Sequence, residues 1–404
     1  MGVTHLKTLL EKYATGGIKT YADMAEFARA KRRELGLGPR DKIIVAVDVS
    51  MYMIRYERNG KLLELFLRQW LMALLDGVIL LYVFDGIAPQ QKRSIIKDRQ
   101  QKKQRVRSRL EQMASTSFVK GTQGTDPNNN TCDLSSYSVD SLLEHIDRTM
   151  SETFSRPCET FSKPGKGSPS SNYEEFMTPA KRAEFVRLGK RLASISNSST
   201  DKLKKFFDLL RVPYITALEE ADGLMVSLWQ QGLVHALQTE DSDVWVMNCG
   251  SVIHVSNKGV KHFCLPRMLE SLGLTYEQFV DLCVLLGSDY YKAYLPKMKW
   301  HELYNLYISL NDPCIAEFLM VYATIDSNII NHIDDYTKAR DLFLAPIPKI
   351  VTHIDVNLCP ISVDTITRYF NSNGIKLDDR EIKRLCSTLG KANAFIKRLN
   401  PTAV

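Results

Sequence analysis

The chain has 404 residues, of which 44% are hydrophobic and 25% are charged, and its formal net charge is +7. This balance is typical of a globular protein with one large domain or two ordinary ones. No run of about 18 apolar residues predicts a transmembrane helix, and the N-terminus lacks the charged-then-apolar pattern of a secretory signal. The eight cysteines include no Cys-x-x-Cys pair, which argues against a zinc knuckle and suggests reduced thiols in an intracellular protein.

The first predicted elements are two buried strands with a helix between them. Apolar runs at 43–47 and 78–84 predict parallel strands, and the strongly apolar segment 62–75 predicts a core helix. Residues 90–110 then hold nine basic residues and one acidic residue, while the rest of the chain is nearly neutral. This basic run predicts a polyanion-binding element, with a solvated helix face as the alternative.

The middle of the chain has a different composition. Residues 112–175 are rich in Ser, Thr, Asn, Gly and Pro, so we expect them to be mostly disordered, with a short helix near 139–150. Thr178-Pro179 then predicts the start of a helix over 180–193, because Thr favours the cap position and Pro the first helical turn.

The rest of the chain alternates between short strands and helices. We predict strands at 213–215, 233–237 and 244–247, helices at 221–230 and 276–286, and a helical region after 293. Strands that alternate with helices predict an α/β fold with a mostly parallel central sheet and helices on both faces. We divide the chain into an N-terminal region 1–111, the insertion 112–175, an internal region 176–292 and a helical region 293–404.

Acidic residues follow the predicted strands, where ligand sites of open α/β sheets lie. Taken singly, each has an ordinary alternative as a turn residue, a helix cap or a partner of a helix dipole. Together, crowded carboxylates repel one another unless divalent cations neutralise them. Oxygen ligands without His or Cys favour magnesium or manganese. Two such ions form a clamp for phosphodiester hydrolysis that activates water and stabilises charge on the reacting oxygens.

These acidic segments resemble the motifs of the flap endonuclease family, the structure-specific 5′ nucleases that include the XPG-type repair nucleases. The similarity covers nearly the whole chain except 112–175, and its most specific segment is Phe279–Tyr290. The other segments that carry it are 1–6, 45–51, 82–92, 213–222, 239–243 and, more weakly, 378–385. The resemblance implies a PIN-like 5′ nuclease fold with a helical arch and a helical, DNA-binding C-terminal region that packs on the nuclease core.

The resemblance also implies roles for individual residues. Two Mg²⁺ ions, with Mn²⁺ as a substitute, would be held by Asp48, Asp85, Glu220, Asp222, Asp241, Asp243 and Asp289. Lys92 and Arg99 would form the catalytic basic pair that reaches the scissile phosphate. Nucleic-acid contacts are expected at Gly2, Tyr52, Arg93, Lys97, Lys102, Lys103, Lys190, Arg191, Lys297 and Lys299. For Tyr52, stacking on a base competes with simple packing in the core.

The sequence departs from the family pattern at three places. Asp222 stands where the family usually has Glu. Residues 294–300 contain no glycine, although the family has a Gly-rich hairpin there that holds potassium and duplex phosphates. The usual sliding-clamp peptide is not found at the C-terminus. Residues 200–207 resemble that peptide without its glutamine, but Leu203, Phe206, Phe207 and Leu210 also form a core stripe.

The resemblance therefore implies a monomeric, magnesium-dependent flap endonuclease that also acts as a 5′-3′ exonuclease, with no membrane partner. Its substrates would be DNA flaps, nicks or junctions in replication, repair or recombination. The alternatives are a catalytically weak or inactive DNA-binding scaffold on the same fold, and a nuclease directed at RNA. A sliding clamp as partner is left open, and so is the choice between the nucleus and a cytoplasmic replication site.

Overall fold

The computed structural model describes residues 2–38, 41–87, 93–121, 179–192, 195–288, 295, 298–349 and 351–399. The chain divides into two compact units, each considered by itself. The first comprises residues 1–52, 63–93 and 198–404, and the second comprises residues 53–62 and 94–197. None of the helices in the described ranges is long and apolar enough to cross a membrane.

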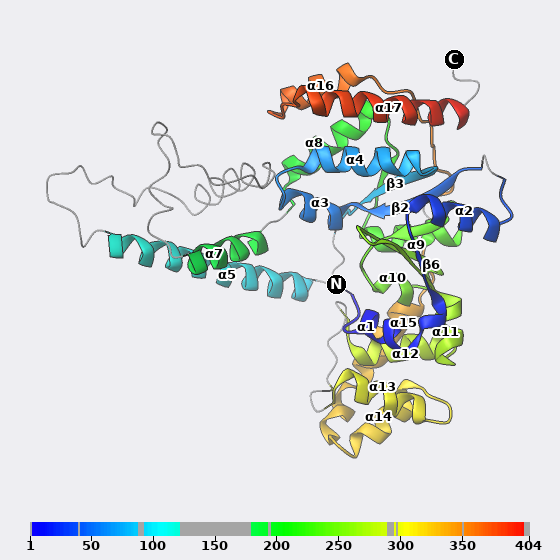
Figure 1. Cartoon of the computed structure of the whole chain (residues 1–404). Helices are drawn as coiled ribbons and strands as arrows, with labels where there is room; N and C mark the ends of the chain where they lie inside the picture. The colour runs from blue at the N-terminus through cyan, green and yellow to red at the C-terminus, as the bar shows by residue number, and fades with distance from the viewer. Residues whose placement is uncertain are drawn as a thin grey trace. The chain divides into compact units, whose positions relative to one another are not determined.

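The first unit is built on a seven-stranded sheet with the order β1-β7-β6-β5-β2-β3-β4 (Figure 1). Only the pairs β1–β7 and β6–β7 are antiparallel, so the sheet is mostly parallel, as predicted. The strands are β1 (Ile18–Tyr21), β2 (Ile43–Asp48), β3 (Val78–Phe84), β4 (Tyr214–Thr216), β5 (Ala236–Gln238), β6 (Ser251–Ser256) and β7 (Gly259–Cys264).

Helices surround this sheet and continue beyond it. Those before residue 250 are α1 (Leu6–Tyr13), η1 (Thr15–Gly17), α2 (Met24–Glu34), α3 (Val49–Glu57), α4 (Leu62–Leu75), α8 (Asn197–Leu210), α9 (Ala221–Gln230) and α10 (Asp243–Val246). Those after it are α11 (Leu265–Leu272), α12 (Tyr276–Leu286), α13 (Trp300–Ser309), α14 (Ile315–Ala323), η5 (Ser327–His332), α15 (Ile333–Leu344), α16 (Val363–Ser372) and α17 (Asp379–Leu399).

Strand β3 shows how the two faces of the sheet are covered. The Tyr82 ring lies 5.6 Å from Phe66 of α4 and 4.7 Å from Phe207 of α8. The neighbouring residue Val83 belongs instead to the large core cluster that contains Met225 of α9. Because side chains alternate along a strand, α4 and α8 cover one face and α9 covers the other. The predicted placement of helices on both faces is therefore confirmed.

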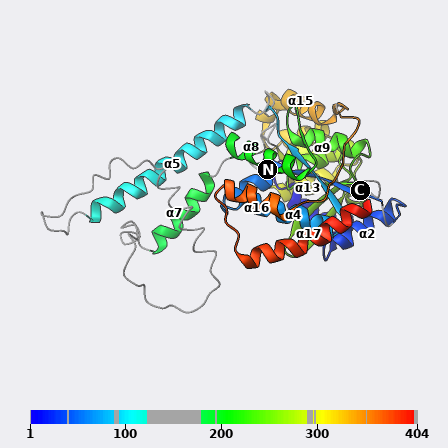
Figure 2. The ribbon, with the colours of Figure 1, turned by 90° about the horizontal axis from the view of Figure 1, so that it is seen from above.

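The C-terminal helices add a layer on α8. Phe206 of α8 stacks on Tyr369 of α16 at 5.2 Å, and the Tyr369 hydroxyl donates to the Lys202 carbonyl. Figure 2 shows α16 beside α17. The apolar stripe of α8, including Leu203 and Leu210, is buried. Residues 200–207 therefore serve as a core helix, which confirms the packing alternative to a clamp-binding peptide.

Most predicted elements of this unit are confirmed, and one is wrong. The structure has the predicted helices 62–75, 221–230 and 276–286 and the predicted strands 43–47 and 78–84. The strand predicted at 213–215 is shifted by one residue, and the strand predicted at 233–237 is confirmed only at its end, because β5 begins at Ala236. The strand predicted at 244–247 is wrong, because 244–246 belong to the short helix α10 and Met247 is its C-cap, with the Asp243 carbonyl accepting from the Met247 N–H at 2.9 Å. The error arises because a short apolar run cannot distinguish a buried strand from a buried helical turn.

The second unit contains a pair of helices, α5 (Arg93–Gly121) and α7 (Pro179–Leu192), which lie alongside each other (Figure 1). Leu110 of α5 packs with Phe185 and Leu188 of α7, and Arg109 Nη2 is 2.6 Å from Glu184 Oε1. Helix α7 confirms the helix predicted at 180–193. Helix α5 continues into the stretch predicted to be irregular, while residues 122–178, including the expected helix at 139–150, lie outside the described residues.

Candidate active site

The carboxyl ends of three neighbouring strands meet at one edge of the sheet. In the register, Asp48 at the end of β2 lies opposite Val83 of β3, and Val47 lies opposite Gln238 of β5. Asp85 follows β3 directly, and Asp241 follows β5 after two residues. The predicted gathering of strand-end carboxylates is therefore confirmed for these three residues.

Ser50 connects two of these carboxylates. Its N–H donates to Asp48 Oδ1 at 3.0 Å, and its Oγ donates to Asp85 Oδ2 at 2.5 Å. Both donors come from the first turn of α3, which begins at Val49 directly after β2. The strand-to-helix turn thus holds Asp48 and Asp85 with a hydrogen bond to each.

Thr239 performs a similar role on the other side of Asp48. Its Oγ1 donates to Asp48 Oδ2 at 3.2 Å and accepts from the Asp241 N–H at 3.1 Å. Asp241 Oδ1 in turn accepts from the Asp243 N–H at 3.1 Å, and Asp243 is fully buried at the start of α10. The Thr239-x-Asp241-x-Asp243 spacing therefore builds a chain of hydrogen bonds that starts at Asp48.

Asp85 also marks the start of helix α9. Its Oδ1 accepts from the Ala221 N–H at 2.9 Å, so the negative charge lies at the positive end of the helix dipole. Glu220 is the N-cap residue of α9, and Asp222 lies in its first turn and is 9% exposed. The structure thus places Glu220 and Asp222 on the segment that binds Asp85.

Gly86 allows this close approach. Its N–H donates to the Glu219 carbonyl at 2.5 Å, and a Cβ at this position would collide with the backbone oxygens of Ala217 and Leu218. The Asp85-Gly86 pair is therefore not an ordinary turn. Glycine is required because the segment after β3 runs against the segment after β4.

The carboxylates at this edge repel one another. Burial, together with the nearby Asp85 and Asp241, raises the pKa of Asp48 from 3.8 to about 7, although hydrogen bonds from Met51 and Thr239 oppose the rise. A raised carboxyl pKa means that the ionised form is unfavourable in the folded protein. A divalent cation would remove this repulsion, so the charges of this set suit Mg²⁺ or Mn²⁺.

The donor atoms are carboxylate oxygens, and the chemistry of the set fits hard cations. Within the described ranges, however, no three His, Cys, Asp or Glu side chains are grouped so that they could hold a metal ion. The structure therefore shows a crowded acidic edge rather than a closed coordination shell. Asp289, one of the seven predicted ligands, lies outside the described residues.

The N-terminal segment packs against the acidic edge. Gly2 has φ +88°, and a Cβ there would collide with Asp241 Oδ1 and Ser242 Oγ. The Thr4 N–H donates to the Gly287 carbonyl at 2.8 Å, and Ser242 Oγ donates to the Val3 carbonyl at 3.3 Å. Only glycine fits beside Asp241 in this conformation, and the predicted nucleic-acid contact of Gly2 stays a prediction.

The position of Tyr52 argues against its predicted contact with nucleic acid. It is 4% exposed, and its hydroxyl accepts a hydrogen bond from Gln238 Nε2. A buried ring with a satisfied hydroxyl cannot stack on a base, so the prediction for Tyr52 is corrected in favour of core packing. The physical reason is that α3 turns this residue toward β5.

The predicted basic contacts lie on other elements. Lys97, Lys102 and Lys103 are exposed on α5 of the second unit, and Lys299 is exposed at the N-cap of α13. Helix α5 also contains Arg93 and Arg99, and α7 contains Lys190 and Arg191, but the side chains of these four lie outside the described residues. Lys92 and Lys297 lie outside them entirely. The roles of all these residues stay predictions.

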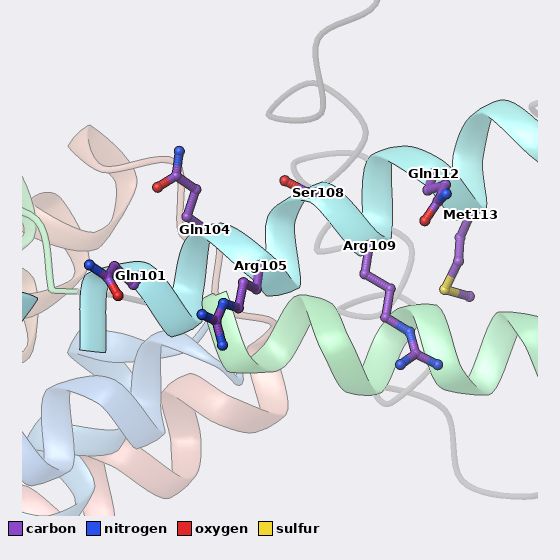
Figure 3. A pocket seen from close by; sticks show the side chains of 7 residues that line it. All are labelled: Gln101, Gln104, Arg105, Ser108, Arg109, Gln112 and Met113. Atoms are coloured by element: carbon purple, nitrogen blue, oxygen red, sulfur yellow. The ribbon is translucent and has the colours of Figure 1, made fainter. Parts of the chain in front are cut away.

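Helix α5 borders a hollow of about 840 Å³ within the second unit. Figure 3 shows Arg105 and Arg109 of its lining extending toward α7, while Gln104 points away from it. The Arg109 guanidinium bonds to Glu184. The described part of the basic run therefore lies on a helix that packs against α7, where Arg109 bonds to Glu184 while Lys97, Lys102 and Lys103 are exposed.

Sequence reasoning missed Ser50 and Thr239 as site residues. Both lie inside the motif segments that carry the family resemblance, at 45–51 and 239–243. Their position in these motifs is therefore the sequence feature that could have identified them as site residues. Their function depends on which carboxylate each hydroxyl faces, and only the structure shows this.

Comparisons with known proteins agree with the motifs. A family model described as the XPG I-region matches residues 211–289, which include β4, α9, β5 and the loop of Asp241. Flap endonuclease 1 of Entamoeba histolytica is 32% identical over 181 residues, covering 41% of this chain and 44% of the relative. Flap endonuclease 1 of Salmo salar is 28% identical over 253 residues, covering 57% and 64%. The matches thus span less than two thirds of these relatives.

Among solved structures, the catalytic core of Rad2 in complex with DNA substrate is similar over 97% of this chain and 100% of its own, with a TM-score of 0.57 and 14% identity. At this identity the likeness concerns the fold alone. These findings confirm the predicted resemblance to the XPG/RAD2-type flap endonuclease family and the PIN-like 5′ nuclease fold.

Proposed function

We propose that this chain is a metal-dependent, structure-specific 5′ nuclease that hydrolyses phosphodiester bonds at 5′ flaps or branches in DNA. The observation that carries the proposal is the acidic edge, where Asp48, Asp85 and Asp241 meet at the ends of parallel strands and where burial, with the charges of Asp85 and Asp241, raises the pKa of Asp48. The similarity to flap endonucleases supports it, as does the DNA substrate in the Rad2 complex. Such a nuclease would act in DNA replication, repair or recombination.

The residues of this edge would have different roles. Asp48, Asp85, Glu220, Asp222, Asp241, Asp243 and Asp289 would hold two Mg²⁺ ions. When bound, these ions supply an activated water and stabilise charge on the attacking and leaving oxygens. Ser50 and Thr239 hold the Asp48 carboxylate from its two sides through hydrogen bonds to Oδ1 and Oδ2. The ligands are thereby oriented in advance, which avoids reorganisation during the reaction.

Basic residues would hold the nucleic-acid backbone. The exposed Lys97, Lys102 and Lys103 of α5 offer three cations along one helix, suited to phosphate contacts that carry no sequence information. Lys92 and Arg99 would provide the catalytic basic pair near the scissile phosphate. With these contacts, the chain would recognise DNA by its branched structure and its backbone charge rather than by its base sequence.

Cleavage of a 5′-labelled flap DNA tests the proposal. We expect Mg²⁺-dependent cutting near the junction that stops with a chelator and is lost in Asp85→Asn. Asp85 is exposed, so this variant is expected to fold, and Asp201→Asn on the exposed face of α8 is the matched control. Cutting that persists in Asp85→Asn would contradict the assignment of the acidic edge.

A second candidate is a DNA-binding scaffold on the same fold. It is favoured by the finding that no ready metal-binding group of three side chains exists within the described ranges. The same flap assay separates the two candidates, because a scaffold binds the junction without cutting it. A parallel series with RNA flaps of one sequence tests whether the chain prefers RNA.

A further inference from the structure

The helical region 300–344 of the first unit contains none of the residues placed at the acidic edge or expected to contact nucleic acid. This region contains seven acidic and two basic residues, although the whole chain has a net charge of +7. One of the two basic residues, Arg340, has its Nε 2.5 Å from Oδ1 of the buried Asp281. Surfaces that bind a polyanion are basic, so this region has the wrong sign for nucleic acid.

The same region exposes large apolar side chains. Met320 of α14 is 68% exposed, Ile330 of η5 is 58% exposed, and Ile325 between them is 50% exposed. Ile308 of α13 and Ile333 and Leu342 of α15 are exposed as well. Single exposed apolar residues are ordinary, but several on adjoining elements indicate an interaction site.

These side chains are not needed to build the core. Helix α14 already buries Ile315, Phe318, Leu319 and Tyr322, which form one complete helical face. Met320 lies on the outside of that helix. Its exposure therefore adds nothing to the packing of the unit, and it remains available for contact with another molecule.

We propose that the exposed apolar residues Met320, Ile325, Ile330 and Ile333, which lie on and between the adjoining elements α14, η5 and α15, dock a basic amphipathic segment of another protein. The apolar side of such a segment would cover these four residues, as amphipathic helices do in apolar grooves. Its Lys and Arg side chains would meet the exposed Asp334 and Asp341 of α15. Charge complementarity of this kind selects the partner and speeds association.

The charge of the region argues against the other occupants. A symmetric dimer through this face would bring two copies of the same acidic surface together, which is unfavourable. DNA would meet carboxylates rather than cations. A basic protein segment is the occupant that satisfies both the apolar side chains and the negative charge.

Binding of designed peptides to the full chain tests this proposal. The probe is a fluorescent amphipathic helix with Leu on one face and Lys and Arg on the other, and the control peptide replaces Lys and Arg with Glu. Anisotropy titrations are made with the wild type, with Met320→Gln/Ile330→Gln and with Asp334→Asn/Asp341→Asn. Matched controls are Met72→Gln on the exposed side of α4 and Asp201→Asn on α8.

We expect the basic peptide to bind more tightly than the acidic one, and each double variant to weaken this binding by about tenfold, while the controls leave it unchanged. Equal binding of both peptides, or unaltered binding by the apolar variant, would overturn the proposal. Two other results would also overturn it. One is a wild-type dimer, seen in sedimentation, that Met320→Gln/Ile330→Gln dissociates. The other is a loss of flap DNA binding in that variant.

Discussion

Replacement of Asp48 by Asn is predicted to stabilise the metal-free protein. The pKa of Asp48 is raised from 3.8 to about 7, first by burial and then by Asp85 and Asp241. Since the folded-state pKa lies above the unfolded value, the stability that the protonated group contributes is complete below pH 3.8 and is lost as the pH rises through 7. One pKa unit corresponds to about 1.4 kcal/mol, so ionised Asp48 costs up to ~4 kcal/mol at pH 8.

The assay is urea unfolding at pH 8 in the presence of a chelator. Local relaxation reduces the cost of ionised Asp48 below its upper limit. We therefore expect Asp48→Asn to raise the free energy of unfolding by about 1–3 kcal/mol, whereas Asp201→Asn changes it little. Mg²⁺ should then stabilise the wild type more than the variant. If the variant is less stable than the wild type in chelator, Asp48 contributes favourable contacts rather than repulsion, and the prediction is wrong.

Three further predictions concern the surrounding structure. Gly86→Ala should lower the free energy of unfolding by about 1–3 kcal/mol because its Cβ meets the Ala217 carbonyl, and unchanged urea unfolding would contradict this. Arg340→Met should cost about 3–5 kcal/mol because Asp281 would stay buried without its cation, with Arg398→Met as an exposed control. Burial lowers the pKa of His262 from 6.5 to about 4, so its contribution to stability is complete above pH 6.5 and falls by about 2 kcal/mol at pH 5. His262→Asn should remove that part of the pH dependence, and an identical profile would contradict it.

The central strands could be predicted because their sequence leaves few alternatives. Residues 43–47 and 78–84 are apolar at every position, as strands buried on both faces require. The hairpin of β6 and β7 escaped prediction because His254, Lys261 and His262 interrupt the apolar pattern. His262 is nevertheless buried, and its Nε2 lies 2.9 Å from Ser251 Oγ across the hairpin. Pairing of buried polar groups depends on tertiary structure, which local sequence does not reveal.

The carboxylates of the candidate site could be predicted from the sequence, but the hydrogen bonds that hold them could not. The position of Asp48 and Asp85 after successive strands was enough to place them at one sheet edge, because parallel strands align their carboxyl ends. The sequence left open whether Tyr52 stacks on a base or packs in the core, since its contact with Gln238 joins residues far apart in the sequence. For the same reason, the hydrogen bonds of Ser50 and Thr239 emerged only from the fold.

Binding of Mn²⁺ to the acidic edge shows directly whether Asp48, Asp85 and Asp241 help to form a metal site. Calorimetric titration of the metal-free protein with Mn²⁺ is predicted to show two sites per chain that Mg²⁺ displaces. Asp85→Asn and Asp241→Asn should each weaken this binding, and Asp201→Asn should leave it intact. If the wild type binds no Mn²⁺ at low millimolar concentration, or if both site variants bind it as the wild type does, the carboxylates do not form the metal site and the account is contradicted.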